Sequence, residues 1–395
     1  MKLSWRKTIA AVAVGSVGVF GLVGQAGASD PIANSGQDNV NDQILGGGSD
    51  TTFVMENELA QLYNQSPGGV TDNTSGSATL GQITTSPNAA PTANQNDNWD
   101  HDIVANAYPT GSGAGIAGIG TKFDFARSSR VATAGELATR SAWGFGKDGI
   151  VMVTPPGRTV SSLTKAQIQG IYAGTITNWN QIPGQAAGTI HAYGMNPSSG
   201  TYGTFKTYIG AEPNNSGVTP GAGVGLGGNT TFPFENDFKP VLADITARGW
   251  IASDVIWWGS FGEFKTYPYK SQGASFWQNN GVTATASTIR TNAFDNTRIL
   301  YRIAATSSIQ LGGGNAADTP LTTTGATSGK AGAVRRYFDW VCEPTSYFDA
   351  AGTNTALNPF FGTNYYDLIG QAITNSGFQR TPAAERNAGA CKVNA

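Results

Sequence analysis

The sequence is poor in the residues that metal and nucleophilic chemistry most often need. Its 395 residues include only two His and two Cys, too few to build a zinc or iron–sulfur centre from those side chains. Charged residues make up 13% of the chain, and the net charge of −2 comes with no basic tract. This balance argues against electrostatic binding of nucleic acid. We therefore expect no metal, no cofactor and no nucleic-acid partner.

Other residues are abundant. Glycine accounts for 53 positions, about twice its usual share. Hydrophobic residues make up 39% of the chain and include nine Trp, which argues against wholesale disorder. A chain of this length normally forms two domains with large cores.

The first 28 residues are typical of a secretory signal peptide. A basic start precedes an apolar run over residues 9–23, and Ala26-Gly-Ala28 forms a cleavage site before Ser29. A membrane anchor is the alternative, but the run is short and interrupted by glycines, and no later stretch approaches 18 apolar residues. No Cys stands at the cleavage site, where Ser29 is the first residue after it. We expect an exported protein, periplasmic or extracellular, that is not lipid-anchored and whose mature chain carries a net charge of about −5.

Export permits disulfides, and Cys342 and Cys391 are the two cysteines of the sequence. One disulfide between them is the simple prediction. It would close a loop of about 50 residues and stabilise the fold by roughly 4 kcal/mol in the chain-entropy model. A reactive thiol is the alternative, which the absence of a nearby His in the sequence disfavours.

Two stretches, residues 65–100 and 210–228, are polar or Gly-rich and predict long surface loops. The second contains no Lys, so it does not match a phosphate-binding GxxxxGK[ST] loop. Between the loops, strand-like and helix-like segments alternate. Ile150–Val153 and Ile299–Ile303 predict strands, whereas Leu163–Tyr172 predicts a helix that starts with a T-x-x-Q capping box. The alternation predicts an α/β fold with mainly parallel sheets.

Three segments place glycine and hydroxyl residues directly before a predicted helix. They are Gly48–Phe53, Gly111–Gly115 and Ser198–Thr201. A helix start offers unpaired N–H groups and a partial positive charge, and Ser or Thr adds a hydroxyl donor. Several such starts together can bind an oxyanion without a metal. Ordinary helix capping is the alternative for each segment alone.

The order of these segments carries a family resemblance. Leu163–Asn180, which includes G-T-I-T-N-W, resembles a signature of the phosphate-binding proteins of ABC phosphate importers. Ser199-Gly-Thr201 is similar to the anion loop of that family, and Gly48–Phe53 to its N-terminal G-x-x-x-T-F. Phe123–Ser129 and Tyr337–Trp340 resemble its D-F-G-A-S-D and F-F-D-W segments. The resemblance covers most of the mature chain.

The resemblance implies a two-lobed α/β fold of the class II periplasmic-binding-protein type, with the ligand in a cleft between the lobes. Lobe one would combine residues 41–145 and 301–395, and lobe two would span 146–300. The protein would be a monomeric binding protein rather than an enzyme. It would capture phosphate or a related oxyanion and deliver it to an ABC permease.

The resemblance also implies the ligand-binding residues, which are Thr52, Phe53, Ser112, Ser129, Ser199, Gly200 and Thr201. Two family positions differ here. The carboxylate that accepts the proton of hydrogen phosphate falls at Ser129, and the loop arginine falls at Met195. Arg127 and Arg130 could restore positive charge from another direction, with surface or interdomain pairing as the alternative.

Other functions stay open. The lobes could serve as an extracellular scaffold or adhesion protein, with the long loops as its binding elements. His101 lies among aspartates that could hold a cation, although a solvated acidic loop is the simpler interpretation. Trp257 and Trp258 could form a sugar-stacking surface or a buried strand. A secreted hydrolase has no recognisable nucleophile–base pair in this sequence.

Overall fold

The computed structural model describes residues 46–65, 111–215, 223–227, 231–306, 334, 337–338, 340–341, 361–381 and 392–394. The signal segment, His101 and both cysteines lie outside these residues, as do all of the first predicted loop beyond Gln65 and parts of the second. The signal-peptide and disulfide predictions therefore stay predictions.

The helices of the described residues range from four to thirteen residues in length. They are α2 (Phe53–Gln65), α4 (Ser112–Gly118), α5 (Ala134–Leu137), α6 (Lys165–Ala173), α7 (Gly200–Ile209), α8 (Lys239–Arg248), α9 (Phe261–Thr266), α10 (Pro268–Ser271), α11 (Ala286–Arg290) and α14 (Tyr365–Asn375), with the 3₁₀ turns η3 (Trp179–Gln181) and η4 (Ala252–Asp254).

The strands range from two to fifteen residues in length. They are β1 (Gly46–Gly48), β2 (Phe125–Ser128), β3 (Arg140–Thr154), β4 (Ser162–Leu163), β5 (His191–Ala192), β6 (Val255–Ser260), β7 (Ser275–Phe276), β8 (Gln278–Asn279), β9 (Thr297–Ala305), β10 (Gln379–Arg380) and β11 (Lys392–Asn394).

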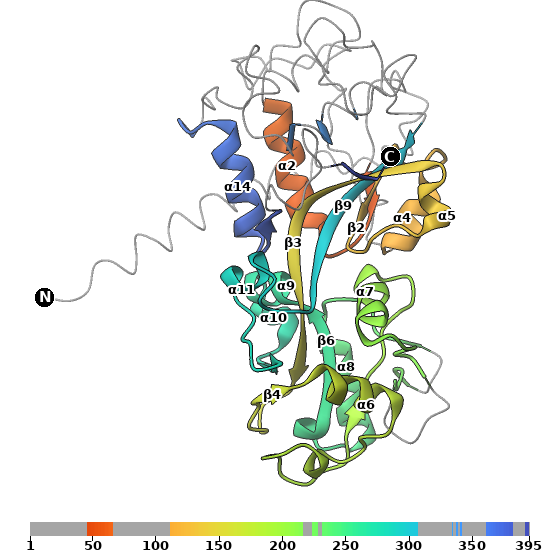
Figure 1. The fold of residues 1–395 in the computed structure, drawn as a ribbon, viewed down its shortest axis with the longest axis vertical. Helices are drawn as coiled ribbons and strands as arrows, with labels where there is room; N and C mark the ends of the chain where they lie inside the picture. Colours follow the sequence, from red (N-terminus) through yellow and green to blue (C-terminus); the bar gives the residue numbers. More distant parts are fainter. Residues whose placement is uncertain are drawn as a thin grey trace, which may run out of the picture.

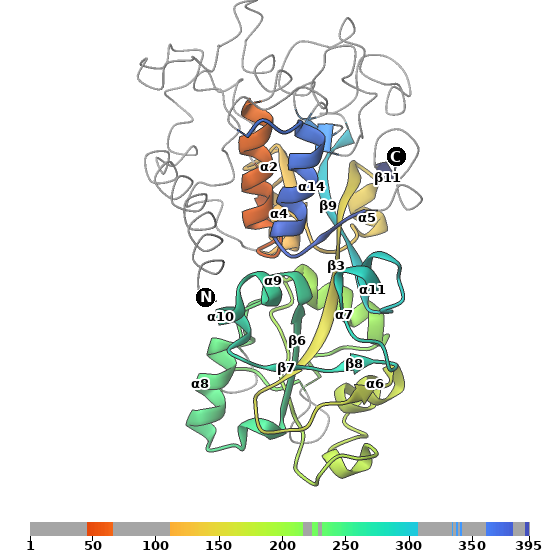
Figure 2. The ribbon, with the colours of Figure 1, turned by 90° about the vertical axis from the view of Figure 1, so that its left-hand side faces the viewer.

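The molecule has two lobes, one above the other in Figure 1. The upper lobe contains α2, α4, α5 and α14 around β1, β2 and the adjoining ends of β3 and β9. The lower lobe contains α6 to α8 around β5, β6 and the far end of β3 (Figures 1 and 2). The two-lobed α/β fold predicted from the sequence is confirmed.

The long strands β3 and β9 connect the lobes. They pair antiparallel from Arg140 opposite Ala305 to Gly149 opposite Thr297. Beyond that point β3 enters the lower lobe, where Ile150–Val153 pair with β6. The sequence predicted only these last four residues as a strand, because Gly144, Gly146 and Gly149 interrupt the apolar pattern before them.

The prediction of mainly parallel sheets is wrong. Only β1–β2, β5–β6 and β4–β8 pair parallel among the described strands, whereas β2–β9, β3–β9 and β3–β6 pair antiparallel. The strand order β1-β2-β9-β3-β6-β5 explains why. The chain leaves the upper lobe along β3 and returns along β9, so the central pair runs in opposite directions. Alternation of strands and helices predicts the pairing inside a lobe but not the direction of the connecting strands.

Each lobe has its own hydrophobic core. Buried residues from Ile150 to Phe294 form one cluster, and residues of α2, α14 and the upper ends of β3 and β9 form another. The core therefore divides close to the connecting strands, and the lobe boundaries near residues 146 and 300 stay a prediction. No helix within the described ranges is long and apolar enough to cross a bilayer.

Several local predictions hold. The helix predicted after Gly48–Phe53 is α2, and its apolar residues Met55, Leu59, Leu62 and Tyr63 are buried together in the core of the upper lobe. Helix α6 begins with the expected capping box, in which Thr164 accepts a hydrogen bond from the backbone N–H of Gln167.

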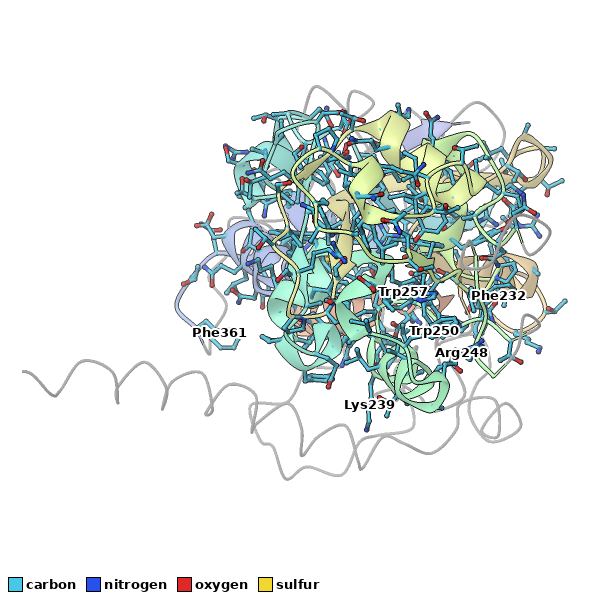
Figure 3. The ribbon with its side chains drawn as sticks, turned by 90° about the horizontal axis from the view of Figure 1, so that it is seen from below. Phe232, Lys239, Arg248, Trp250, Trp257 and Phe361 are labelled. Atoms are coloured by element: carbon cyan, nitrogen blue, oxygen red, sulfur yellow. The ribbon has the colours of Figure 1, made fainter. Side chains whose placement is uncertain are left out.

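The tryptophans of β6 belong to the core. Trp257 and Trp258 are fully buried, so they form no sugar-stacking surface. His191 stacks on Trp250 with ring centroids 3.8 Å apart. The guanidinium of Arg248 also lies against Trp250, 4.7 Å from the ring centroid (Figure 3). His191 therefore packs against an aromatic ring in the lower lobe.

Candidate functional site

The three loops expected to bind an anion meet where the lobes face each other. Gly200 starts α7 in the lower lobe, and a Cβ atom there would lie 2.2 Å from the Ser112 Oγ and 2.3 Å from the Ser129 Oγ. These serines belong to the upper lobe. Only a glycine allows the start of α7 to approach their hydroxyls this closely.

We call this region the hydroxyl cradle, and its members are buried residues of both lobes. They are Ser49, Thr51, Thr52, Ser112, Ser129, Ser199, Gly200 and Thr201.

The serines of the upper lobe form a connected network. Ser129 donates its backbone N–H to the Ser112 Oγ at 3.0 Å, and the two hydroxyl oxygens are 3.3 Å apart. Ser49 donates to the Ser129 Oγ at 3.0 Å. The sequence analysis named Ser112 and Ser129 and missed Ser49, although it lies in the Gly48–Phe53 segment.

The two threonines before α2 have different environments. Thr51 Oγ1 lies 3.5 Å from Thr201 Oγ1 of the lower lobe. Thr52 Oγ1 is buried and has no hydrogen-bond partner. A buried hydroxyl without a partner is unfavourable, so this group is available to a ligand. Phe53 is half-buried and faces Arg127, whose guanidinium lies 5.1 Å from the ring centroid.

Arg298 of β9 supplies a buried positive charge to the cradle. Its Nη1 donates to Thr201 Oγ1 at 2.7 Å and to the Ser129 carbonyl at 3.2 Å. Its Nη2 lies 3.3 Å from Thr51 Oγ1. One guanidinium thus contacts the loops of both lobes.

Asp148 of β3 holds Arg298 in this orientation. Asp148 Oδ2 accepts from Nε and Nη2 of Arg298 at 3.0 and 2.8 Å, and also from Ser260 Oγ. Asp148 Oδ1 accepts the backbone N–H groups of Gly149 and Gly262. The carboxylate is therefore fully hydrogen-bonded, as a buried charge requires. Because Nε and Nη2 both donate to one carboxylate oxygen, Asp148 Oδ2, Nη1 of Arg298 is left to donate to the cradle.

The two arginines that the sequence suggested have other partners. Arg130 forms a bidentate pair with Glu136, with both distances 2.8 Å. Arg127 is buried in the upper lobe and donates to the carbonyls of Gly46 and Ser49. The positive charge at the cradle loops comes from Arg298, which sequence reasoning missed.

The loop before α7 is held by the Gly-rich stretch. Asn214 accepts from the backbone N–H of Met195 at 2.9 Å and donates to the Met195 carbonyl at 2.7 Å. Met195 is buried, and its sulfur lies 3.3 Å from the Ser199 hydroxyl oxygen. The described part of residues 210–228 therefore packs on the cradle loop instead of forming a free insertion.

A carboxylate also enters the cradle. Glu235 accepts hydrogen bonds from the Ser199 hydroxyl and from the backbone N–H of Thr201, the latter at 3.1 Å. Its other oxygen lies 3.4 Å from the Ser49 hydroxyl. Nothing in the local sequence around residue 235 indicates this position.

An acidic cluster lies next to the cradle. Burial raises the pKa of Asp50 to about 6, with Glu235 adding to the shift and Lys270 opposing it. Burial also raises the pKa of Glu263 to about 8, although Lys270 forms an ion pair with it. The charged forms of both carboxyls are disfavoured in the folded protein.

These shifts predict a pH dependence of stability. A carboxyl whose pKa is higher in the folded state than in the unfolded state stabilises the protein at pH values below the unfolded-state pKa. This contribution is lost as the pH rises through the folded-state pKa. For Asp50 this window runs from about pH 4 to pH 6. We expect Asp50→Asn to raise the melting temperature at pH 7.5 relative to the unchanged protein, and to leave it nearly the same at pH 4.5.

Thermal unfolding monitored by circular dichroism at the two pH values tests this expectation. Glu136→Gln is the control, because its pairing with Arg130 lowers the pKa of Glu136 to about 2, outside the tested range. Equal effects of Asp50→Asn at both pH values would contradict the assignment.

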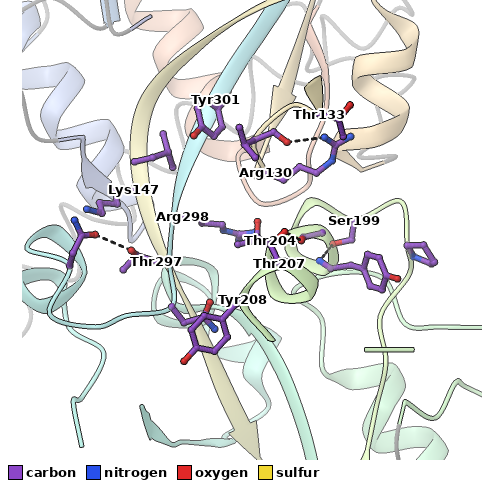
Figure 4. A pocket seen from close by; sticks show the side chains of 17 residues that line it. Arg130, Thr133, Lys147, Ser199, Thr204, Thr207, Tyr208, Thr297, Arg298 and Tyr301 are labelled. Atoms are coloured by element: carbon purple, nitrogen blue, oxygen red, sulfur yellow. Dashed lines mark hydrogen bonds between the residues drawn. The ribbon is translucent and has the colours of Figure 1, made fainter. Parts of the chain in front are cut away.

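A cavity of about 670 Å³ borders the cradle (Figure 4). Ser199 and Arg298 line it, together with Tyr208 and other residues of α7. Arg298 lies between Lys147 on one side and Ser199 on the other in this view. The cavity gives a path from the gap between the lobes to the cradle donors.

The missed residues had only weak signals. Arg298 and Arg302 lie four residues apart in an otherwise apolar strand, which places them on one face. Arg302 pairs with Glu56 inside the upper lobe at 2.7 Å, so the pattern alone does not identify the arginine at the cradle.

The sequence model of the PBP superfamily domain matches residues 46–355. No curated protein matches the sequence.

Several solved structures are similar. A phosphate ABC transporter substrate-binding protein from Clostridium perfringens, solved with bound phosphate, is 15% identical with a TM-score of 0.52, covering 86% of this chain and 100% of that chain. An ABC-type phosphate transport receptor from Vibrio cholerae is 21% identical with a TM-score of 0.45, covering 67% and 87%. A phosphate-binding protein from Stenotrophomonas maltophilia is 15% identical with a TM-score of 0.45, covering 87% and 91%.

Proposed function

The chain belongs to the PBP superfamily, and on that premise we propose that it is an exported solute-binding protein for ABC-type uptake. Its ligand is phosphate or a related tetrahedral oxyanion, bound in the hydroxyl cradle between the lobes. The role is reversible capture with closure of the lobes around the ligand, without catalysis.

One observation carries the proposal. Ser112 and Ser129 of the upper lobe approach Gly200 of the lower lobe, and Thr51 Oγ1 of the upper lobe lies 3.5 Å from Thr201 Oγ1 of the lower lobe. Thr52 Oγ1, next to Thr51 in the chain, is buried without a partner. Oxygen atoms of an oxyanion accept hydrogen bonds, and hydroxyls and backbone N–H groups donate them. A ligand with four acceptor oxygens could therefore satisfy donors from both lobes at once.

Arg298 supports the same conclusion. The guanidinium that this family's loop would place at Met195 is absent, and Arg298 brings one to the same loop from β9. A charge-assisted bond from a guanidinium is about twice as strong as a neutral one. Because Asp148 already fixes Arg298, the donor needs little reorganisation when a ligand binds.

The similar structure from Clostridium perfringens supports the fold on which the proposal depends. That protein is described as a phosphate ABC transporter substrate-binding protein with bound phosphate. Low identity limits this support to the architecture, so the ligand of the present chain must be argued from its own cradle.

Calorimetric titration of the mature chain from Ser29 with phosphate and then sulfate tests the proposal. We expect a phosphate dissociation constant near micromolar, or roughly −8 kcal/mol. Ser112→Ala with Thr201→Ala should weaken binding about 30-fold, since two hydrogen bonds are lost. Thr246→Ala on α8 is the control, because its hydroxyl donates only to the Leu242 carbonyl. Equal phosphate binding by the double variant and the unchanged protein would remove the basis of the proposal.

The alternative of an extracellular scaffold or adhesion protein stays a prediction. It depends on the loops at 65–100 and 210–228, of which the first beyond Gln65 and parts of the second lie outside the described residues. A neighbouring permease gene would favour uptake, and deletion of the loops would separate the two roles.

A further inference from the structure

Glu235 is buried inside the cradle and uses donors that an oxyanion would need. Its Oε2 accepts from the Ser199 hydroxyl and from the backbone N–H of Thr201 at 3.1 Å. Its Oε1 lies 3.4 Å from the Ser49 hydroxyl of the other lobe. The residue is 2% exposed.

The contacts of Glu235 are those of a bound anion. The Thr201 N–H lies in the first turn of α7, where unpaired backbone donors and the helix dipole favour negative charge. A carboxylate presents two acceptor oxygens to such donors, as one edge of a phosphate does. Two anions cannot accept the same hydrogens, so a ligand and Glu235 compete for Ser199 and Thr201.

The neighbouring residue holds Glu235 in place. Asn236 has a φ of 61°, a left-handed conformation that asparagine tolerates better than most residues. Its Nδ2 donates to Thr51 Oγ1 at 2.8 Å, and its Oδ1 accepts the Ser260 N–H at 2.9 Å. Asn236 thus ties this segment to β6 in the lower lobe and to the cradle of the upper lobe.

We propose that Glu235 is an internal anion of the cradle, which an incoming oxyanion must displace. This inference rests on the proposed function, since it names the residue that competes with the ligand. Glu235 lowers the affinity of the cradle and, through Ser49, helps hold the lobes together before a ligand arrives. The affinity for an oxyanion then depends on how well the oxyanion makes the three contacts of Glu235, which are those with Ser199, Thr201 and Ser49.

Two variants test the competition. Glu235→Gln keeps the shape of the side chain and removes its charge, whereas Glu235→Ala removes the competing group. We expect both to bind phosphate more tightly in calorimetry, with a gain of about tenfold for Glu235→Ala because a charge-assisted contact no longer competes. Glu212→Gln is the matched control, since Glu212 pairs with Lys206, Tyr202 and the Asn214 N–H and accepts no hydrogen bond from a cradle residue. Its phosphate affinity should not change.

A second measurement does not depend on phosphate. Small-angle X-ray scattering of the ligand-free proteins should show a larger radius of gyration for Glu235→Ala than for the unchanged protein, because the Ser49 contact between the lobes is lost. The Glu212→Gln control should match the unchanged protein. Thermal unfolding of each variant establishes that it is folded.

The outcomes separate the two proposals. Tighter phosphate binding by the Glu235 variants supports the internal anion. Equal or weaker binding by both variants overturns it, and weaker binding would mean that Glu235 contacts the ligand directly. If no protein binds phosphate, the proposed function fails. In that case a larger radius for Glu235→Ala supports the internal anion, and an unchanged radius overturns it.

Discussion

Arg298→Ala is expected to lower the free energy of unfolding by about 3–5 kcal/mol, because it leaves the Asp148 carboxylate buried and without its cationic partner. Arg298 is 5% exposed and Asp148 is 1% exposed, so water does not compensate for the loss. The same change removes the guanidinium that contacts Thr201 and Ser129. We therefore expect phosphate binding to weaken about 100-fold as well.

Urea unfolding and calorimetry measure the two effects separately. Arg298→Lys keeps the positive charge but loses the two-donor contact with Asp148 Oδ2, so we expect it to recover part of the stability and little of the binding. Arg130→Ala is the control, because its pair with Glu136 is partly exposed and should contribute no more than about 1 kcal/mol. A loss of stability for Arg298→Ala that is no larger than that of Arg130→Ala would show that the buried pair does not hold the connecting strands.

Gly200→Ala is expected to weaken phosphate binding by about 100-fold, since overpacking a close contact opposes the approach of the lobes. The added methyl group would lie 2.2 and 2.3 Å from the hydroxyl oxygens of Ser112 and Ser129. Both serines are buried and already engaged with each other, so neither can move away freely. The lobes can relieve the clash by staying apart, because each has its own core.

Scattering and calorimetry of Gly200→Ala test this expectation. We predict a larger radius of gyration and a small change in melting temperature. Gly113→Ala is the matched control, because a Cβ there would lie 3.7 Å from its nearest neighbour, the Ser198 carbonyl, which is ordinary contact. Phosphate binding by Gly200→Ala as tight as that of Gly113→Ala would contradict the closed arrangement of the cradle.

Part of the cradle was predictable because its signals are local. A serine or threonine before a helix, with a glycine beside it, predicts that its side chain caps the first turn of that helix. Ser199 does cap α7, where it accepts the Tyr202 N–H at 3.2 Å. The apolar spacing of α2 and the capping box of α6 are local in the same way. The family resemblance then placed Thr52, Ser112 and Ser129 in one cleft.

The charged groups of the cradle were not predictable in this way. Arg298 is 97 residues from Thr201, and Glu235 is 186 residues from Ser49. The sequence instead pointed to Arg127 and Arg130, because they are adjacent to Ser129. Arg127 donates to backbone carbonyls of the upper lobe, and Arg130 forms an ion pair with Glu136. Proximity along the chain was a poor guide to charge at the site.

The sequence by itself determined the helix starts, the apolar faces and the hydroxyl donors, since each depends on residues within one turn or one strand. The tertiary structure alone decided which charges meet those donors. Strands β3 and β9 cross between the lobes in opposite directions and bring Asp148 and Arg298 together at 2.8 Å. The segment after the Gly-rich loop brings Glu235 to the start of α7. Electrostatic contacts act through space, and no pattern along the chain records which distant segments the folded sheet brings together.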